Sequence, residues 1–170
     1  MAYIEYPECG RVINTHGCRG GIKIEPWCDS PAVFAALKTV YFKKGDAMVP
    51  VAVRRTAVLG NRFVSAELEG VTTMEEADAL RGTVLFAKRA DLGIPAGALL
   101  IAEMIGLPVF DKESGSRLGT LTDVIHPGAT DIYVIATDRG EALVPVVPQF
   151  VYSADLEKGI VLTPIEGMFE

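Results

Sequence analysis

Metal-ligating and nucleophilic residues are scarce in this chain. Its 170 residues include two histidines, His16 and His126, and three cysteines, no two of which form a CxxC pair. A structural zinc site needs ligands in closely spaced pairs, so the sequence predicts no bound metal. The odd number of cysteines also argues against a disulfide framework and favours a reducing compartment.

Long apolar runs and phosphate-binding loops are missing as well. No run approaches the ~18 apolar residues that a membrane-spanning helix needs, so we expect no membrane-embedded part. The opening residues MAYIEYPECG lack a basic segment followed by an apolar one, so we expect no secretory signal. The glycine-containing segment 16–21 matches neither the GxGxxG nor the Walker pattern, and we expect no cofactor.

What the chain does contain is the composition of a folded, mainly β protein. Hydrophobic residues make up 49% and charged residues 22%, which argues against wholesale disorder, and seventeen glycines and ten prolines favour many turns over a helix bundle. Short stretches rich in valine, isoleucine and aromatic residues alternate with turn residues. They predict strands over residues 10–13, 22–25, 40–42, 49–58, 63–68, 84–87, 107–110, 118–124, 132–135, 142–146, 150–153 and 160–162.

Two helical segments and one hairpin carry local signals. Thr73 and Glu76 form a capping-box pattern, in which each side chain can satisfy a free backbone donor at the start of a helix. The Ser-Pro pair that begins at Ser30 predicts the N-cap and first residue of a short helical turn. The pair Gly60-Asn61, between two alternating runs, predicts a β-hairpin.

A segment without periodicity divides the chain. Residues 88–98, KRADLGIPAGA, combine two glycines with a proline, which is typical of a linker. We therefore expect an N-terminal domain over residues 1–88, a linker over 89–98 and a C-terminal domain over 99–170. A small, mostly antiparallel sheet hides its edges most easily by closing, so we expect two small β-barrels.

Charge is distributed unevenly between the two halves. Through Lys88 the chain has eleven Lys and Arg against ten Asp and Glu, whereas from Arg89 onwards it has five against twelve. An acidic module repels phosphate backbones, so the second half is a poor candidate for binding nucleic acid. Its charge suits the docking of a basic protein.

The segment around residues 16–21 contains the candidate RNA-binding residues. Arg19 and Lys23 flank a run of glycines, with Arg11 and His16 nearby, so cationic side chains could reach an RNA phosphate. One alternative is a solvated turn whose glycines serve positive φ angles. A nucleophilic pair of His16 and Cys18 is another, although no catalytic constellation is visible. These observations favour a binding or assembly factor over an enzyme.

Further motifs follow one another in a fixed order along the chain. The stretch GRVINTHGCRGGIKI at 10–24 contains a strand, a His-Gly-x-x-Gly turn and the next strand. Other motifs follow at Asp29, Phe34-x-x-Leu37, Glu76-Ala77, Leu80-x-Gly82, Ile105-Gly106-Leu107, Leu118-Gly119, 127–134 (PGATDIYV), 143–151 (LVPVVPQFV) and Pro164-x-Glu166-Gly167. Together, and over nearly the whole chain, these motifs resemble those of the ribosome maturation factor RimM family.

The resemblance implies a six-stranded N-terminal β-barrel of the RimM type and a C-terminal barrel of the PRC type. It implies a cytoplasmic bacterial assembly factor, without enzymatic activity, for the head of the small ribosomal subunit. The implied partners are this subunit with its rRNA and a basic head protein, small-subunit ribosomal protein S-nineteen, and we expect the chain to be a monomer.

An unrelated two-barrel RNA-binding module is the alternative to a member of this family. Such a module would need exposed aromatic residues interleaved with basic ones for base stacking. Only the segment Phe42-Lys43-Lys44 hints at that pattern.

One departure from the family pattern lies at the entry to the C-terminal domain. The family commonly carries aromatic residues there, followed by an acidic one, whereas this chain has Leu99, Leu100, Ile101 and Glu103. Three consecutive apolar residues cannot all face the core from one strand, so we expect at least one to be exposed or to pack outside that core. Two interpretations stay open: packing between the domains, and an apolar anchor for the ribosomal protein, rimmed by Glu103 and Asp131.

Overall fold

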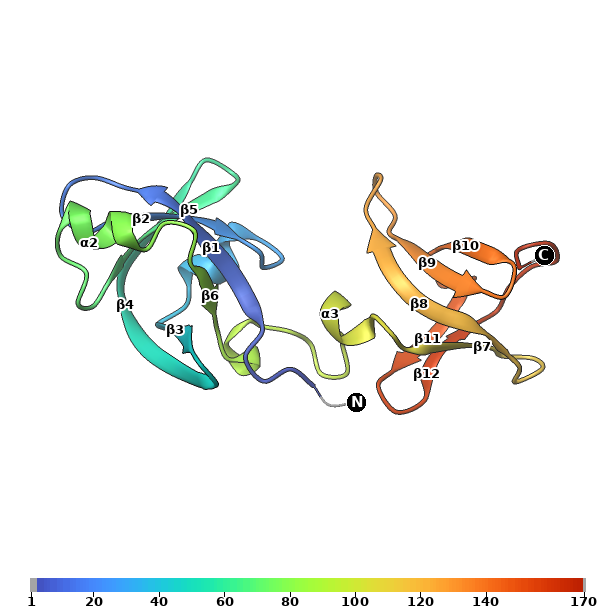
Figure 1. The fold of residues 1–170 in the computed structure, drawn as a ribbon. Coiled ribbons are helices and arrows are strands. Elements are labelled where there is room, and N and C mark those ends of the chain that lie inside the picture. Colours follow the sequence, from blue (N-terminus) through green and yellow to red (C-terminus); the bar gives the residue numbers. More distant parts are fainter. Residues whose placement is uncertain (1–2, 170) are drawn as a thin grey trace. The chain divides into compact units, whose positions relative to one another are not determined.

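The computed structural model describes residues 3–169 and consists mainly of β-strands (Figure 1). It divides into two compact units, one formed by Ile4–Pro95 and the other beginning at Ala96. Each unit has its own hydrophobic core. None of the helices within residues 3–169 has the length and apolar character to cross a membrane.

The first unit is a closed barrel of six antiparallel strands. Its elements are β1 (Glu8–Thr15), β2 (Ile22–Pro26), α1 (Pro31–Ala35), β3 (Thr39–Lys44), β4 (Ala47–Leu59), β5 (Phe63–Leu68), α2 (Met74–Ala79), β6 (Val84–Phe86) and the 3-10 turn η1 (Arg89–Asp91). The strand order is β1-β2-β5-β4-β3-β6, and β1 pairs with both β2 and β6, which closes the ring. The predicted six-stranded barrel is confirmed.

Alternating side chains of the strands fill this barrel. Val12, Ile24 and Val64 point inward and are fully buried, and Phe34 of α1 packs into the same core. Residues between these positions therefore point outward, which decides the character of the outer face. At Gly10, a Cβ would lie 2.8 Å from the carbonyl oxygen of Glu25 in β2, so glycine permits the close approach of the two strands.

The two helix starts and the hairpin turn that the sequence predicts are present in the structure. Thr73 is the N-cap of α2, and its Oγ1 accepts a hydrogen bond from the backbone N–H of Glu76 at 3.1 Å. Ser30 is the N-cap of α1, although its side chain makes no capping hydrogen bond. Gly60, with φ at +61°, lies in the turn between β4 and β5, as the hairpin signal predicts.

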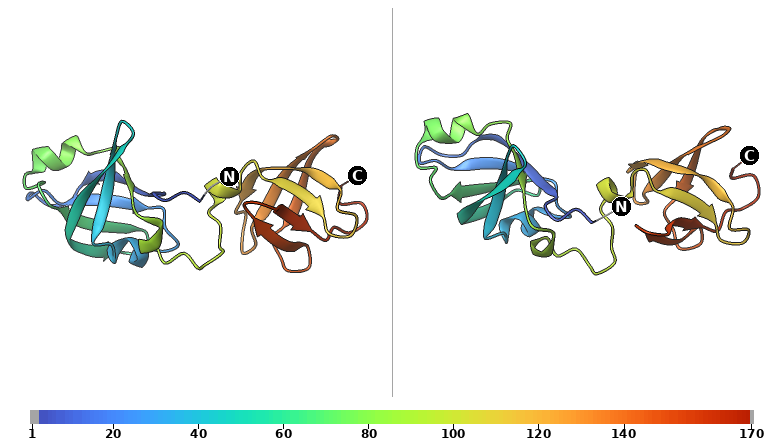
Figure 2. Two further views of the ribbon diagram at one scale, coloured as in Figure 1. Left: turned by 90° about the horizontal axis from the view of Figure 1, so that it is seen from below. Right: turned by 60° about the horizontal axis from the view of Figure 1, so that its bottom comes forward.

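The second unit is a six-stranded sheet with a different pattern. Its elements are α3 (Ile101–Met104), β7 (Pro108–Asp111), β8 (Arg117–Ile125), β9 (Ile132–Thr137), β10 (Gly140–Pro145), β11 (Val151–Asp155) and β12 (Gly159–Leu162). The strand order β10-β9-β8-β7-β12-β11 ends at β10 and β11. Figure 2 shows the sheet of each unit curling around its own core.

One strand pair of the second unit departs from the antiparallel arrangement that we expected. β12 runs parallel to β7, while the other paired strands are antiparallel. The reason is that β11 and β12 form a hairpin, and β12 rather than β11 lies beside β7. Leu107, Leu121, Ile135 and Ile160 form the centre of the core between these strands.

The predicted linker over residues 89–98 is partly structured. η1 occupies its start, and Leu92 packs against the core of the first unit. Gly93 and Gly97 adopt φ angles of +65° and +81°, which glycine reaches without strain. The boundaries at residues 88 and 99 and the independent folding of the two domains stay predictions.

Candidate functional site

The turn between β1 and β2 holds two of the predicted RNA-binding residues, His16 and Arg19, both exposed. The backbone N–H of His16 donates to the carbonyl oxygen of Gly21 at 2.8 Å, which closes the turn. Gly17 and Gly20 adopt φ angles of +78° and +89°, as expected for glycines in a tight turn. A Cβ at Gly20 would also clash with the Val71 backbone, so glycine is required there.

The other two predicted residues, Arg11 and Lys23, lie on the outer face of the barrel. Arg11 is opposite Glu25 and Lys23 is opposite Ser65, so their side chains share the face that the buried core residues avoid. The guanidinium of Arg11 lies 6.0 Å from the ring centre of Trp27. Nη2 of Arg11 also lies 3.8 Å from a carboxylate oxygen of Glu25, an exposed pair that contributes little stability.

A second cluster of cations and an aromatic ring continues this face on β5. Nζ of Lys23 lies 4.4 Å from the centre of the Phe63 ring, and the guanidinium of Arg62 lies 5.3 Å from the same ring. We call Arg11, Lys23, Trp27, Arg62 and Phe63 the basic–aromatic face. It offers cations to phosphates and rings to bases, the combination that single-stranded nucleic acid requires.

Sequence reasoning missed Trp27, Arg62 and Phe63 as members of this face. The signal was present in part, because Lys23, Glu25 and Trp27 alternate along one strand and its end. What brings Phe63 to Lys23 is the pairing register of β2 with β5, which no local pattern specifies.

Two of the three cysteines, Cys9 and Cys28, are held in an unreactive form, whereas Cys18 of the turn between β1 and β2 is exposed. Burial raises the pKa of Cys9 to about 12, with Cys28 nearby as a smaller cause, and burial raises the pKa of Cys28 to about 11. Both thiols are therefore held protonated, the unreactive form. Within the described residues no group of three His, Cys, Asp or Glu side chains could hold a metal ion.

The predicted protein-binding segment at the start of the second unit is divided between core and surface. Leu99 packs against the core, whereas Ile101, the first residue of α3, is 41% exposed, so the expectation of one exposed side chain is confirmed. Glu103 is 3% exposed, and its Oε1 accepts a hydrogen bond from the backbone N–H of Leu100 at 2.8 Å. The expectation that Glu103 rims the surface is wrong, because its carboxylate caps α3.

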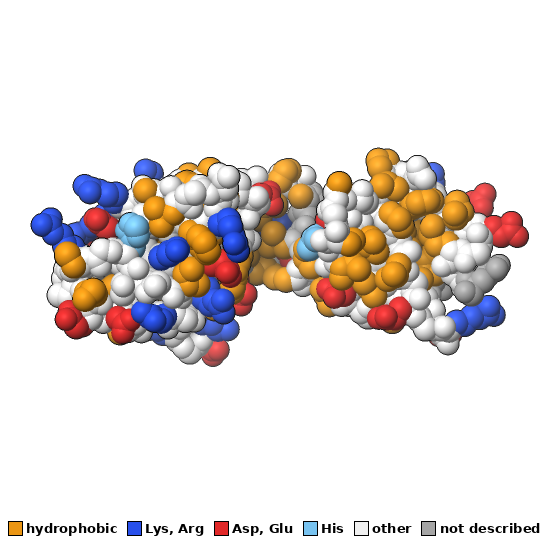
Figure 3. Space-filling model, turned by 90° about the horizontal axis from the view of Figure 1, so that it is seen from above, with side chains coloured by type: hydrophobic (Ala, Val, Ile, Leu, Met, Phe, Trp, Pro, Cys, Tyr) orange, Lys and Arg blue, Asp and Glu red, His pale blue; other side chains and the backbone are white. Residues whose placement is uncertain are grey.

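An apolar surface on β8, β9 and β10 was not expected. Leu143 pairs with Val134, and Ile132 pairs with both Pro145 and Ile125, so these five side chains share the face opposite the core. Leu143 is 55% exposed and Ile125 is 37% exposed, whereas Val134 between them is 8% exposed. We call these five residues the apolar face. On the side that Figure 3 shows, basic side chains gather on the first unit and hydrophobic ones on the second.

Carboxylates border the apolar face. Asp123 pairs with Val134, Glu141 lies two residues before Leu143, and Asp131 lies in the loop before β9. Oδ1 of Asp131 lies 2.7 Å from Nδ1 of His126. Burial, with Asp131 as a smaller cause, raises the pKa of Tyr133 on the inner side. An apolar centre with an acidic border suits a basic protein partner.

The sequence contained a signal for the apolar face. Residues Ile132–Ile135 are all apolar, whereas a strand with one solvated face alternates apolar and polar residues. A continuous apolar run at this place indicates that the outer face of the strand is apolar as well as the inner one. We interpreted the run only as a strand.

Comparison with known proteins identifies both units. A family model described as the RimM N-terminal domain matches residues 8–92, and one described as the RimM PRC barrel domain matches residues 101–168. Ribosome maturation factor RimM of Symbiobacterium thermophilum is 36% identical over 165 residues, covering 95% of this chain and 92% of that protein. The protein of the same name from Ruminiclostridium cellulolyticum is 34% identical over 158 residues, 92% of each.

A solved structure aligns with the chain as well. It is the crystal structure of a 16S ribosomal RNA processing protein, RimM, from Pseudomonas aeruginosa, with 22% identity and a TM-score of 0.48 over 95% of this chain and 98% of that one. The assignment rests on the family models and on the relatives above 30% identity, which span almost the whole sequence. This chain belongs to the RimM family of ribosome maturation factors.

Proposed function

We propose that this protein is a monomeric, cytoplasmic assembly factor that matures the head of the small ribosomal subunit without enzymatic activity. Its first unit contacts rRNA and its second unit binds the basic head protein S-nineteen. The observation that carries the proposal is the opposite chemistry of the two outer faces. Such a factor acts by binding the productive arrangement of protein and rRNA more tightly than other arrangements, which raises its population.

The RNA contact is proposed for the basic–aromatic face together with the neighbouring turn. Arg11, Lys23 and Arg62 supply three cations, and His16 and Arg19 extend from the turn between β1 and β2. Exposed cations stacked on rings can exchange these contacts for phosphates and bases without reorganising the barrel. Glu25 offsets part of the charge of Arg11, so we assign the larger share of phosphate binding to Lys23 and Arg62.

The protein contact is proposed for the apolar face and its acidic border, including Asp131. Leu99, Leu100 and Ile101 extend the candidate surface through the exposed side chain of Ile101, while Glu103 positions α3 from inside. Five basic against twelve acidic residues from Arg89 onwards favour encounter with a basic partner.

Calorimetric titration of the full chain with purified S-nineteen tests this contact. The double variant Ile125→Ser/Leu143→Ser removes the two most exposed apolar side chains of the face. It should weaken binding by more than about 1 kcal/mol, roughly fivefold or more. The control Ile165→Ser alters a residue outside the face that is more exposed than either of these two, and it should bind normally. Equal affinity of the double variant and the control would reject the proposed surface.

A further inference from the structure

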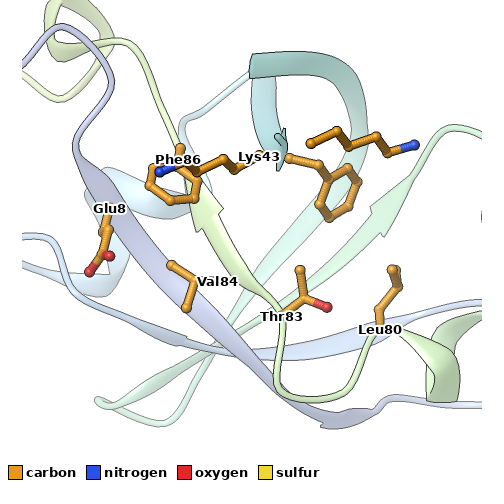
Figure 4. Close-up of a pocket in the computed structure, with 8 residues that line it drawn as sticks. Glu8, Lys43, Leu80, Thr83, Val84 and Phe86 are labelled. Atoms are coloured by element: carbon orange, nitrogen blue, oxygen red, sulfur yellow. The ribbon is translucent and has the colours of Figure 1, made fainter. Parts of the chain in front are cut away.

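The barrel of the first unit is weakly joined between β3 and β6. These strands share the single pair Tyr41–Phe86, whereas β3 and β4 share six pairs. β6 has only three residues, so the last three residues of β3, Phe42–Lys44, continue past the final pair. In the described part of the molecule a hollow of about 640 Å³ lies at this seam, which is in the range of small-molecule sites (Figure 4).

The walls of the hollow are mostly apolar and partly aromatic. Phe42, Phe86, Leu80 and Val84 line it, and all four are partly exposed. Figure 4 shows Phe86 and Val84 on the same side of the hollow, with Leu80 on the other side and Thr83 between Val84 and Leu80. A flat aromatic ligand can stack on such a wall, whereas a compact anion gains nothing from it.

Three charged side chains complete the lining. Lys43 and Lys44 are exposed at the end of β3, and Glu8 extends from β1. None of the three takes part in a salt bridge within the described residues. Two free cations and one free carboxylate therefore border an apolar hollow, and their charges are available to a ligand.

The seam lies across the barrel from Lys23, Arg62 and Phe63 of the basic–aromatic face, although Arg11 of that face pairs with Val84, which lines the hollow. In the closed order β1-β2-β5-β4-β3-β6, the pair β3 and β6 lies across the barrel from the pair β2 and β5, which carries Lys23 and Phe63. Substitutions at Lys23 and Arg62 can therefore be made without touching the seam.

We propose that the hollow at the seam binds one unpaired nucleotide of RNA, with the base stacked on Phe86 and the phosphates on Lys43 and Lys44. Glu8 accepts hydrogen bonds from the base edge, which selects guanine, because guanine presents a ring N–H and an amino group side by side. Phe42, next to Lys44, extends the stacking surface. The site rests on the proposed contact of the first unit with rRNA and adds a second, base-selective contact.

An acidic peptide is the main rival occupant. It would use both lysines, but it would not depend on the aromatic character of Phe86 or on the carboxylate of Glu8. Nucleotide binding requires all three features together, and for this reason we favour it.

The test is fluorescence anisotropy of the full chain with labelled single-stranded hexanucleotides, one of uridines only and one with a single central guanosine. Lys43→Gln/Lys44→Gln should weaken binding of the guanosine oligonucleotide about fivefold or more and lower the salt slope by about 1 to 1.5, since each phosphate contact contributes about 0.7. The control Lys38→Gln/Lys158→Gln removes the same charge at exposed positions outside the hollow. It should keep more of the affinity for the guanosine oligonucleotide and more of the salt slope.

Two further variants test the aromatic wall and the base preference. Phe86→Leu keeps the apolar volume but loses stacking, and should weaken binding about fivefold or more. Glu8→Gln should abolish the preference for guanosine over uridine. Amide NMR spectra of each variant check that the barrel remains folded.

The outcomes separate this proposal from the wider one. Wild-type affinity and base preference in the seam variants, with loss of binding in Lys23→Gln/Arg62→Gln, would overturn the seam site alone. No RNA binding by the wild-type chain would overturn both. Displacement of the RNA by a hexaglutamate peptide, with Phe86→Leu unaffected, would identify a peptide site instead.

Discussion

The two units differ in the side chains that their strands turn outward. The outward positions of β1, β2 and β5 carry Arg11, Lys23 and Phe63, whereas those of β9 and β10 carry Val134 and Leu143. The inward positions of both units are apolar. Because side chains alternate along a strand, each strand specifies its core and its surface independently. The two units therefore have similar cores, and the chemical difference between their surfaces comes from the outward-facing residues of their strands.

The units also differ in how their sheets end. The barrel of the first unit returns to its starting strand, while the sheet of the second ends at β10 and β11. The terminal strand β10 ends at Pro145, which lacks a backbone N–H and so limits pairing with another chain there. The exposed apolar surface of the second unit is thus the side of its sheet rather than an open edge.

Truncating one buried side chain in each unit tests whether the two cores are independent. Ile24→Ala and Ile135→Ala each remove a fully buried side chain, the first from the barrel and the second from the sheet. Each should lower the free energy of unfolding of its own unit by about 2–5 kcal/mol. Amide NMR signals followed through a urea titration report on both units at once. If either substitution shifts both midpoints equally, the chain unfolds as one body and the predicted domain division is wrong.

Removing the buried carboxylate beneath α3 should affect the second unit only. Glu103→Ala deletes the acceptor for the backbone N–H of Leu100 and should cost about 1–3 kcal/mol. Glu103→Gln keeps an acceptor and should cost less. Thermal unfolding compared with the exposed control Glu157→Ala measures both. Identical melting of Glu103→Ala and the control would contradict the capping role.

Alkaline pH should lower the stability of the two units from different pH values, an effect smaller than that of the substitutions above. The thiols of Cys9 and Cys28 ionise near pH 9 in the unfolded chain but have raised pKa values in the barrel. Their contribution to stability is present below pH 9 and is lost as pH rises toward 11 to 12, by up to about 1.4 kcal/mol per pH unit for each thiol.

In the second unit the raised pKa of Tyr133 gives the same sign, beginning near its ordinary value of 10. Urea titrations between pH 8 and pH 11 should therefore show the barrel losing stability first. The variant Cys9→Ala/Cys28→Ala should remove the early part of that loss. A loss that begins at the same pH in both units and persists in this variant would rule out the thiols as its cause.

Much of the fold could be predicted because each strand carries its own pattern. Alternation in residues such as Phe63–Leu68 and the glycine at 60 specify a strand and its turn without tertiary information. α3 was missed because it has only four residues and its N-cap, Leu100, is not a capping residue type. The parallel pair of β7 and β12 was missed because strand order depends on contacts that are distant in sequence.

The candidate sites were harder to predict from the sequence, because they too depend on contacts between residues distant in sequence. Adjacent residues on a regular strand face opposite sides, yet Arg54 and Arg55 are both exposed, at a bulge where the register of β4 shifts. The pairing of Lys23 with Phe63 and the hollow beyond Tyr41–Phe86 likewise arise from register and strand length. Residue type could be read in advance, but the neighbours across the sheet could not.

The measurement that tests the account most directly is binding of both ligand classes to two face variants of the full chain. Arg11→Gln/Lys23→Gln/Arg62→Gln alters the basic–aromatic face, and Ile125→Ser/Leu143→Ser alters the apolar face. The first should lose affinity for a single-stranded fragment of small-subunit rRNA by about fivefold or more and bind S-nineteen normally. The second should show the reverse. If either variant weakens both ligands equally, or if neither weakens its own, the division of binding between the two faces is contradicted.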